Sequence, residues 1–190
     1  GPSRCEVWSC DQPVRLHRDD AISAAFAGDV LFGSITAYED PDAGLDHTTE
    51  KVYRRLLRLL RNSGFHYLWR IWNYFPRINA EERGLERYRL FCMGRHQALA
   101  QTLPGFPGSL PAATAVGTQR GPLQVYFLAG AHPPTHLGNP RQVNAYDYPK
   151  VYGPRSPSFA RATLCRSDSA THLFISGTAS VVGHQSHHIG

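Results

Sequence analysis

The chain has 190 residues, of which 42% are hydrophobic and 18% charged, and its formal net charge at pH 7 is +5. This length fits one ordinary domain or two small ones, and this balance of apolar and charged residues excludes an intrinsically disordered chain. No apolar run approaches the roughly 18 residues of a membrane-spanning helix, and no signal-peptide pattern is present, so we expect a cytoplasmic protein with no membrane partner.

The basic residues are almost all arginines, since Lys51 and Lys150 are the two lysines of the chain. Arginine holds a carboxylate bidentately, which lysine cannot do, although a GC-rich genome would produce the same bias without any function. The basic residues are scattered and accompany no familiar nucleic-acid motif, so we expect no nucleic-acid partner. The cysteines form no CxxC pair, which disfavours a zinc site and favours reduced thiols. They are Cys5, Cys10, Cys92 and Cys165.

The first predicted elements are a strand over residues 30–39 with a kink at Gly33, and a helix that has Asp46 as its N-cap. Apolar residues then recur with the helical period, arginines occupy the other face, and Gly64 is a suitable stop. An aromatic-rich run at 67–75 predicts a buried strand that ends at a proline.

A second helix is predicted over residues 80–102, although Gly84 and Gly94 weaken it. After a loop rich in proline and glycine, two strands follow that a turn joins. The loop covers 104–111, the strands cover 112–118 and 123–130, and the turn is Gly121-Pro122. The order β-α-β-α-β-β predicts an α+β fold, in which a mixed sheet carries its helices on one face.

The rest of the chain has a different composition. Residues 132–161 are rich in proline, glycine and tyrosine and predict one long loop, and such loops in compact domains are usually functional or disordered. The aromatic residues and arginines of this loop argue against disorder. Strands are predicted at 162–166 and 172–181. The histidines that follow have a spacing that could bind zinc from a helix, but their segment predicts a loop, so we expect no metal site. They are His184, His187 and His188.

Short stretches of the sequence resemble the RidA/YjgF family. Residues 110–117 are similar to that family's Pro-Ala-Arg segment before its last strand. Residues 152–160 and 174–177 are similar to the Gly-Pro-x-Ser-x-x-x-Ala and Phe-x-Ser-Gly patterns at its start. The resemblance implies a RidA/YjgF-like (chorismate-mutase-like) fold that is internally duplicated, with an incomplete second copy.

A wider set of motifs resembles the chorismatase family in order and spacing over nearly all of residues 5–190. The motifs include Arg70-Ile71-Trp72-Asn73-Tyr74, Glu86-Arg87-Tyr88-Arg89, Asn139-Pro140-Arg141-Gln142, Tyr152-Gly153-Pro154-Arg155 and Ile175-Ser176-Gly177-Thr178. The resemblance implies an enzyme that cleaves the enol ether of chorismate, without a cofactor. Its products would be pyruvate and either 3- or 4-hydroxybenzoate or a dihydroxycyclohexadiene carboxylate.

The same resemblance implies how the chain is divided. Residues 5–131 would form a first RidA-like unit, and residues 132–190 the active-site loop with the first half of a second unit. Ala113 and Tyr126 stand where the RidA family has its pocket arginine and its glutamate, so we expect the first unit to be a scaffold. Family members are longer at both ends, and their catalytic glutamate falls beyond Gly190. The expected partner is therefore the missing C-terminal part of the same protein, and this segment alone should be inactive.

Chorismate is a dianion, so its enzyme needs anion-binding groups and a proton donor. Tyrosines and arginines of the long loop are the predicted substrate-binding groups, and a glycine in the second unit would let backbone N–H groups approach a carboxylate. Packing and capping roles for the same residues are the alternative, and for the helical arginine among them a surface or helix-dipole role. The predicted site residues are Tyr146, Tyr148, Tyr152, Arg155, Arg161, Gly177 and, in the second helix, Arg95.

Two other functions are open at this stage. One is imine or enamine hydrolysis of the RidA kind, against which the missing pocket arginine at Ala113 argues. The other is a non-catalytic module that binds a small aromatic acid. Release of pyruvate from chorismate would separate the leading interpretation from both.

Overall fold

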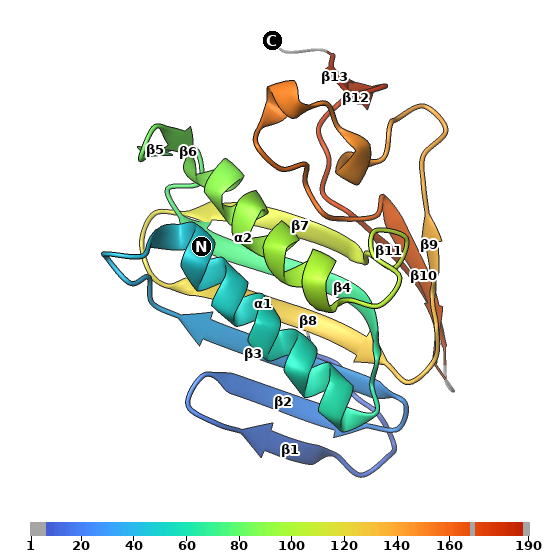
Figure 1. Cartoon of the computed structure of the whole chain (residues 1–190). Helices are drawn as coiled ribbons and strands as arrows, with labels where there is room; N and C mark the ends of the chain where they lie inside the picture. Colours follow the sequence, from blue (N-terminus) through green and yellow to red (C-terminus); the bar gives the residue numbers. More distant parts are fainter. Residues whose placement is uncertain (1–6, 168–169, 188–190) are drawn as a thin grey trace.

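The computed structural model describes residues 7–167 and 170–187. Its main body is a six-stranded mixed sheet with the strand order β1-β2-β3-β8-β4-β7, and both helices lie on one face of that sheet (Figure 1). The predicted α+β fold with a mixed sheet is therefore confirmed. The strands are β1 (Arg15–Arg18), β2 (Ile22–Ala27), β3 (Val30–Ala37), β4 (Tyr67–Pro76), β7 (Ala112–Thr118) and β8 (Leu123–Gly130), and the helices are α1 (Gly44–Ser63) and α2 (Arg87–Thr102).

The main hydrophobic core lies between the sheet and the two helices. Residues of α1 at helical spacing are buried in it, among them Val52, Leu56 and Leu60. Alternate residues of the strands face them, as Leu31 and Ile35 of β3 do. Full burial of such a side chain is worth about 1.5–3 kcal/mol, which is why the helical and strand periodicities decide which face turns inward. None of the helices in the described part of the chain is long and apolar enough to cross a membrane.

Helix α1 begins at Gly44, two residues before the predicted N-cap. Ala43 occupies the N-cap position and makes no side-chain capping bond. Asp46 instead lies in the first turn, where its negative charge favours the helix N-terminus and pairs with Arg83 at 2.6 Å. The predicted stop is confirmed, since Gly64 has a φ of 81°, the left-handed conformation that ends many helices.

Helix α2 is shorter than predicted, because residues 80–86 form a small hairpin instead of its first turns. Arg83 and Gly84 have φ values of 52° and 76°, and a helix interior does not use this left-handed region. The prediction of a helix is therefore wrong for residues 80–86, and α2 starts at Arg87. The hairpin strands are β5 (Glu81–Glu82) and β6 (Leu85–Glu86).

The predicted turn at Gly121-Pro122 connects β7 to β8, but these two strands are not neighbours. Strand β4 lies between them and pairs in parallel with β7 and antiparallel with β8. Strand β3 runs past Gly33 without any shift in its pairing with β2 and β8. Gly33 makes room for the ring of Phe127, which occupies the space that a Cβ atom would need.

A second, antiparallel sheet packs against the first, with the order β11-β10-β9. Trp69, Leu128 and Cys165 are buried between the two sheets. The order 9-10-11 repeats the order 1-2-3 at the edge of the first sheet, which fits the duplication that we propose. The strands are β9 (Thr135–Leu137), β10 (Ala162–Arg166) and β11 (Thr171–Ile175).

The long loop and the last predicted strand are more structured than the sequence indicates. The loop contains β9 and two 3₁₀ helices, and the strand predicted over 172–181 ends at Ile175. The chain leaves the sheet there because the Ser176 hydroxyl donates to the carbonyl of Ala160 at 2.6 Å. The 3₁₀ helices are η1 (Ala145–Asp147) and η2 (Lys150–Tyr152), and a last hairpin is formed by β12 (Val181–Val182) and β13 (Gln185–Ser186).

Candidate functional site

Arg161 holds the long loop together from inside, with 7% of its surface exposed. Its Nη2 donates to the carbonyl of Val143 at 2.7 Å and to the phenol oxygen of Tyr148 at 2.8 Å. Its Nη1 lies 3.4 Å from the Thr178 hydroxyl. The guanidinium carbon is 5.5 Å from the ring centroids of Tyr148 and Phe159. Most of its donors are therefore already engaged in ordering the loop.

Tyr152 lies between Tyr148 and His184 and contacts both rings. The two tyrosine ring centroids are 5.5 Å apart, and the phenol oxygen of Tyr152 lies 2.9 Å from Nδ1 of His184. Tyr152 is 39% exposed, so a ligand can reach its ring and hydroxyl. Sequence reasoning considered His184 as a metal ligand and missed this contact. The described residues contain no group of His, Cys, Asp and Glu placed to hold a metal, and His188 lies outside them.

Tyr146 packs partly buried against the main core, next to the buried Ala145. This contact matches the packing alternative for that tyrosine. Asp147 is the one acidic residue of the long loop. It is exposed, and its carboxylate accepts a hydrogen bond from the Asn144 amide at 3.3 Å. The long loop therefore contains no buried carboxylic acid that could serve as a proton donor.

Arg155 is exposed and forms no ion pair within the described part of the chain. It lies near α2, because its charge adds to burial in lowering the pKa of His96. The preceding Gly153 packs on the side chain of Arg89, whose Cδ would lie 3.4 Å from an added Cβ. The guanidinium of Arg155 is therefore available to an anion beside α2.

Gly177 lies against β7. Its N–H donates to Oγ1 of Thr114 at 3.2 Å, and an added Cβ would lie 3.0 Å from Cγ2 of the same residue. The neighbouring Ser176 accepts a bond from the N–H of Ala113 at 2.8 Å. In this structure the N–H of Gly177 thus has a protein acceptor, and its contact with a ligand carboxylate stays a prediction.

Arg70 reaches the same Thr114 oxygen from β4 and donates to it through Nη2. Its side chain passes the Trp72 ring, with the guanidinium carbon 5.2 Å from the ring centroid. Sequence reasoning used Arg70 as part of a family motif and did not select it for the site. A charged residue inside a strand predicted to be buried was the available signal, because burying a charge is costly without a partner.

Arg95 is 3% exposed, so the surface role considered for it is excluded. Its guanidinium carbon lies 5.2 Å from the Tyr53 ring centroid, and its buried Nε and Nη2 have no hydrogen-bond partner in the part of the chain that the structure describes. Burial raises the pKa of the neighbouring Cys92 thiol to about 12, and the charge of Arg95 opposes that rise. Arg95 therefore places an unpaired positive charge on the helix side of the sheet.

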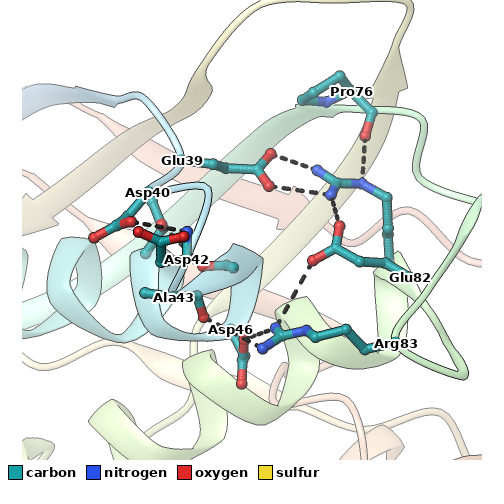
Figure 2. Close-up of polar contacts among 11 residues, drawn as sticks. Glu39, Asp40, Asp42, Ala43, Asp46, Pro76, Glu82 and Arg83 are labelled. Atoms are coloured by element: carbon teal, nitrogen blue, oxygen red, sulfur yellow. Dashed lines mark hydrogen bonds and ion pairs between the residues drawn. The ribbon is translucent and has the colours of Figure 1, made fainter.

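Arg87 fixes the start of α2. It is 1% exposed, its Nε donates to the carbonyl of Pro76 at 3.0 Å, and its other nitrogens bind the carboxylates of Glu39 and Glu82. Burial alone would lower the pKa of Arg87, but the bonds to Glu39 and Glu82 outweigh burial and raise it. Figure 2 shows that Glu39, Pro76 and Glu82 converge from separate segments on this point. The network positions the helix along which Gly153 and Arg155 lie.

A hollow of about 830 Å³ lies elsewhere, between α1 and strands β1 to β3. Its lining includes Arg15, Lys51 and Arg58 but none of the predicted site residues. In the first unit, Ala113 is buried and Tyr126 stacks on Phe32 with ring centroids 6.5 Å apart. Neither position carries a carboxylate or a guanidinium.

These features define an α+β protein in which tyrosines, arginines and backbone N–H groups gather where a second, smaller sheet meets a mixed sheet. The family described as "Chorismatase FkbO/Hyg5-like, N-terminal" matches residues 6–129. The chain therefore belongs to the FkbO/Hyg5-like chorismatase family.

Individual relatives agree with this assignment. A 3-hydroxybenzoate synthase from Streptomyces hygroscopicus is 39% identical over 97% of this chain and 55% of its own length. A chorismatase from Streptomyces rapamycinicus is 37% identical over 99% of this chain and 57% of its own length. A crystal structure of a chorismatase superposes with a TM-score of 0.86 at 38% identity, over 93% of this chain and 53% of that one. The chain thus spans about half the length of the relatives that it matches.

Proposed function

We propose that the full-length protein carrying this chain is a chorismatase, which releases pyruvate from chorismate and leaves a hydroxybenzoate or a dihydroxycyclohexadiene carboxylate. One observation carries the proposal: the 39% identity to a 3-hydroxybenzoate synthase extends over 97% of the chain. The superposition on a chorismatase at a TM-score of 0.86 supports it. The bound partner would be small and anionic, which suits the basic composition of the chain.

The chemistry requires a proton on the methylene carbon of the enol ether. Protonation there creates an oxocarbenium ion, water adds to its cationic carbon, and the resulting hemiketal collapses to pyruvate and the ring alcohol, a dihydroxycyclohexadiene carboxylate. A hydroxybenzoate product contains one water molecule fewer, because its ring also eliminates water as it becomes aromatic. A carboxylic acid with a raised pKa is a suitable donor. We propose that this acid is a glutamate beyond Gly190, because Asp147, the acid of the long loop, is exposed.

Tyr152 and Arg155 are the residues that we propose for direct contact with the substrate. Both are exposed, and Arg155 has no ion pair within the described residues. Tyr148 and Arg161 would support Tyr152 from behind, since Arg161 donates to the Tyr148 oxygen at 2.8 Å and the two tyrosine rings are in contact. The Arg155 fork would fix one carboxylate of the dianion bidentately.

The division into two units is part of the same proposal. Residues 5–131 would be a first unit without its own acid–base groups, and residues 132–190 would open a second unit that further residues complete. Leu173 and Ile175 of β11 are 53% and 66% exposed in this structure. Apolar side chains this exposed on one strand are expected to be covered by a further element. We also propose a cytoplasmic location, where the free thiols of Cys92 and Cys165 stay reduced.

The direct test is incubation of the full-length protein with chorismate. We expect pyruvate, measured by coupling to NADH oxidation, together with an aromatic or cyclohexadiene acid separated by chromatography. A heat-denatured sample corrects for spontaneous breakdown of chorismate. Thermal stabilisation by benzoate without any pyruvate above this control would replace the proposal with a non-catalytic binding module.

A further inference from the structure

Three residues form a hydrogen-bonded group that joins the two sheets, here called the Arg70 hub: Arg70, Thr114 and Gly177. Arg70 lies on β4, Thr114 lies on the adjacent β7, and Gly177 follows β11. Nη2 of Arg70 and the N–H of Gly177 both donate to Oγ1 of Thr114. The hub therefore links the first unit to the turn of the second unit that carries a predicted site residue.

The hub retains two hydrogen-bond donors that have no acceptor in the described residues. A threonine hydroxyl has one proton to donate, and its oxygen can accept two bonds. Both bonds to Oγ1 of Thr114 come from groups that can only donate, so the hydroxyl proton is left to donate elsewhere. Nη1 of Arg70 is also buried and has no hydrogen-bond partner among the described residues.

The hub also lacks a counter-ion. Arg70 is 7% exposed, and no described carboxylate forms an ion pair with it. Burial lowers the pKa of Arg70, Tyr74 on the same strand opposes this change, and the charge of Arg95 lowers the pKa further. A buried guanidinium is stable only when an anion or sufficient acceptors compensate it, and the described residues supply one hydroxyl oxygen and the nearby ring of Trp72.

We propose that the Arg70 hub binds the carboxylate of a small organic acid, with Nη1 of Arg70 and the Thr114 hydroxyl as its two donors. Two convergent donors match the two oxygens of one carboxylate. Entry is from the side of Gly177 and Thr178, which are exposed, and the Gly177 contact that closes the hub is 3.2 Å long. The inference rests on the proposed function, because the carboxylate would be one of the two that chorismate carries.

The test measures carboxylate binding to the full-length protein by calorimetry, without any turnover. Benzoate is the probe, and benzamide is its neutral counterpart of nearly the same shape. We expect Arg70→Gln to weaken benzoate binding about 10–100-fold, the loss typical of one charge-assisted contact. Thr114→Val should weaken it about fivefold, and Arg70→Lys should fall between wild type and Arg70→Gln because the fork is lost. Arg120→Gln, an exposed arginine of the β7–β8 turn, is the matched control and should bind as wild type does.

Unchanged benzoate affinity in both Arg70→Gln and Thr114→Val overturns the inference, even if either variant has a lower melting temperature. So does a wild-type protein that binds benzoate no better than benzamide. If Arg70→Gln does not fold, Thr114→Val decides, because it preserves the shape of the side chain and the charge of Arg70. A protein that binds benzoate through the hub but releases no pyruvate from chorismate would contradict the proposed function. Carboxylate binding at the hub would still be supported by that result.

Discussion

Arginines in this chain differ in how many of their guanidinium N–H groups donate hydrogen bonds to other groups of the protein. Arg87 and Arg161 are buried with most donors bound, so they hold segments in place. Among the described residues, Arg70 and Arg95 are buried with donors that have no acceptor, and Arg155 is exposed and forms no ion pair. A donor that is bound contributes to the fold, whereas a free donor at a pocket is available to a ligand.

Replacing Arg155 should affect catalysis and leave the fold intact. We expect Arg155→Ala in the full-length enzyme to raise KM and lower kcat, with a loss of roughly 2–5 kcal/mol in kcat/KM, because a charge-assisted contact with the substrate disappears. Arg155→Lys should also be poor, since lysine has no bidentate fork. Steady-state kinetics with chorismate measure both. Near-wild-type kinetics in the two variants would remove Arg155 from the site.

Replacing Arg87 should do the opposite and destabilise the protein. We expect Arg87→Met to cost about 3–5 kcal/mol of unfolding free energy, because Glu39 and Glu82 lose the buried partner that both share. Chemical denaturation measures the change. The control is Arg83→Met, whose exposed ion pair with Asp46 should contribute less than about 1 kcal/mol. Equal losses in the two variants would contradict this account.

At the residue scale, some of the site residues predicted from the sequence lie together in the structure, and other residues of the candidate site were not predicted. Tyr148, Tyr152 and Arg161 form one cluster, as a single aromatic and basic loop suggests. Arg70 and Thr114 were missed because they meet only through the parallel pairing of β4 with β7. Sequence patterns report local periodicity and carry no information on which strands become neighbours.

Helices α1 and α2 are in close contact at Gly94. A Cβ atom there would collide with the carbonyl oxygen of Asp46 in α1 and would lie 3.0 Å from Cβ of Thr49. From the sequence alone, Gly94 was expected to weaken the second helix, because glycine has a low helix propensity. The structure shows that its missing side chain permits the contact between α1 and α2.

Gly94→Ala should therefore destabilise the protein by about 1–3 kcal/mol, the usual effect of overpacking. Helix propensity alone predicts the opposite sign, a gain of up to about 1 kcal/mol. The midpoint of urea unfolding gives the sign directly. Gly108→Ala in the loop after α2 is a suitable control, since its Cβ would meet only the Gly105 carbonyl at 3.4 Å. A stabilised Gly94→Ala protein would show that the helices can separate without cost.

At the element scale, long periodic segments were predicted well and edges poorly. The patterns at 67–75, 112–118 and 123–130 correspond closely to β4, β7 and β8. Strand β1 was missed because all of its residues are exposed, so it has no buried alternation. The hairpin before α2 was missed because its turn uses a left-handed Arg83, which is not a turn signal, and because Gly84 was interpreted only as a weak point of the helix.

For the whole molecule, we predict that residues 1–190 expressed alone are inactive towards chorismate and prone to associate. The second sheet has three strands, and its outer strand β11 exposes Leu173 and Ile175. An apolar strand with a free edge is a site of non-native pairing. Pyruvate release and light scattering by the purified segment measure the two effects. Chorismate turnover by this segment in the absence of any other chain would prove the prediction wrong.

The position of β8 in the sheet bears on how the nascent chain folds. Strand β3 pairs with β8 over Val30↔Gly130 to Ala37↔Leu123, so its partner leaves the ribosome roughly 90 residues later. At about 5–20 residues per second, β3 waits roughly 5–20 seconds with Leu31 and Ile35 uncovered. The helices, which form from local contacts, are synthesised during that interval and can shield the apolar side chains. The period of greatest exposure to aggregation thus ends when residue 130 has left the ribosome, before any tyrosine of the long loop has emerged from it.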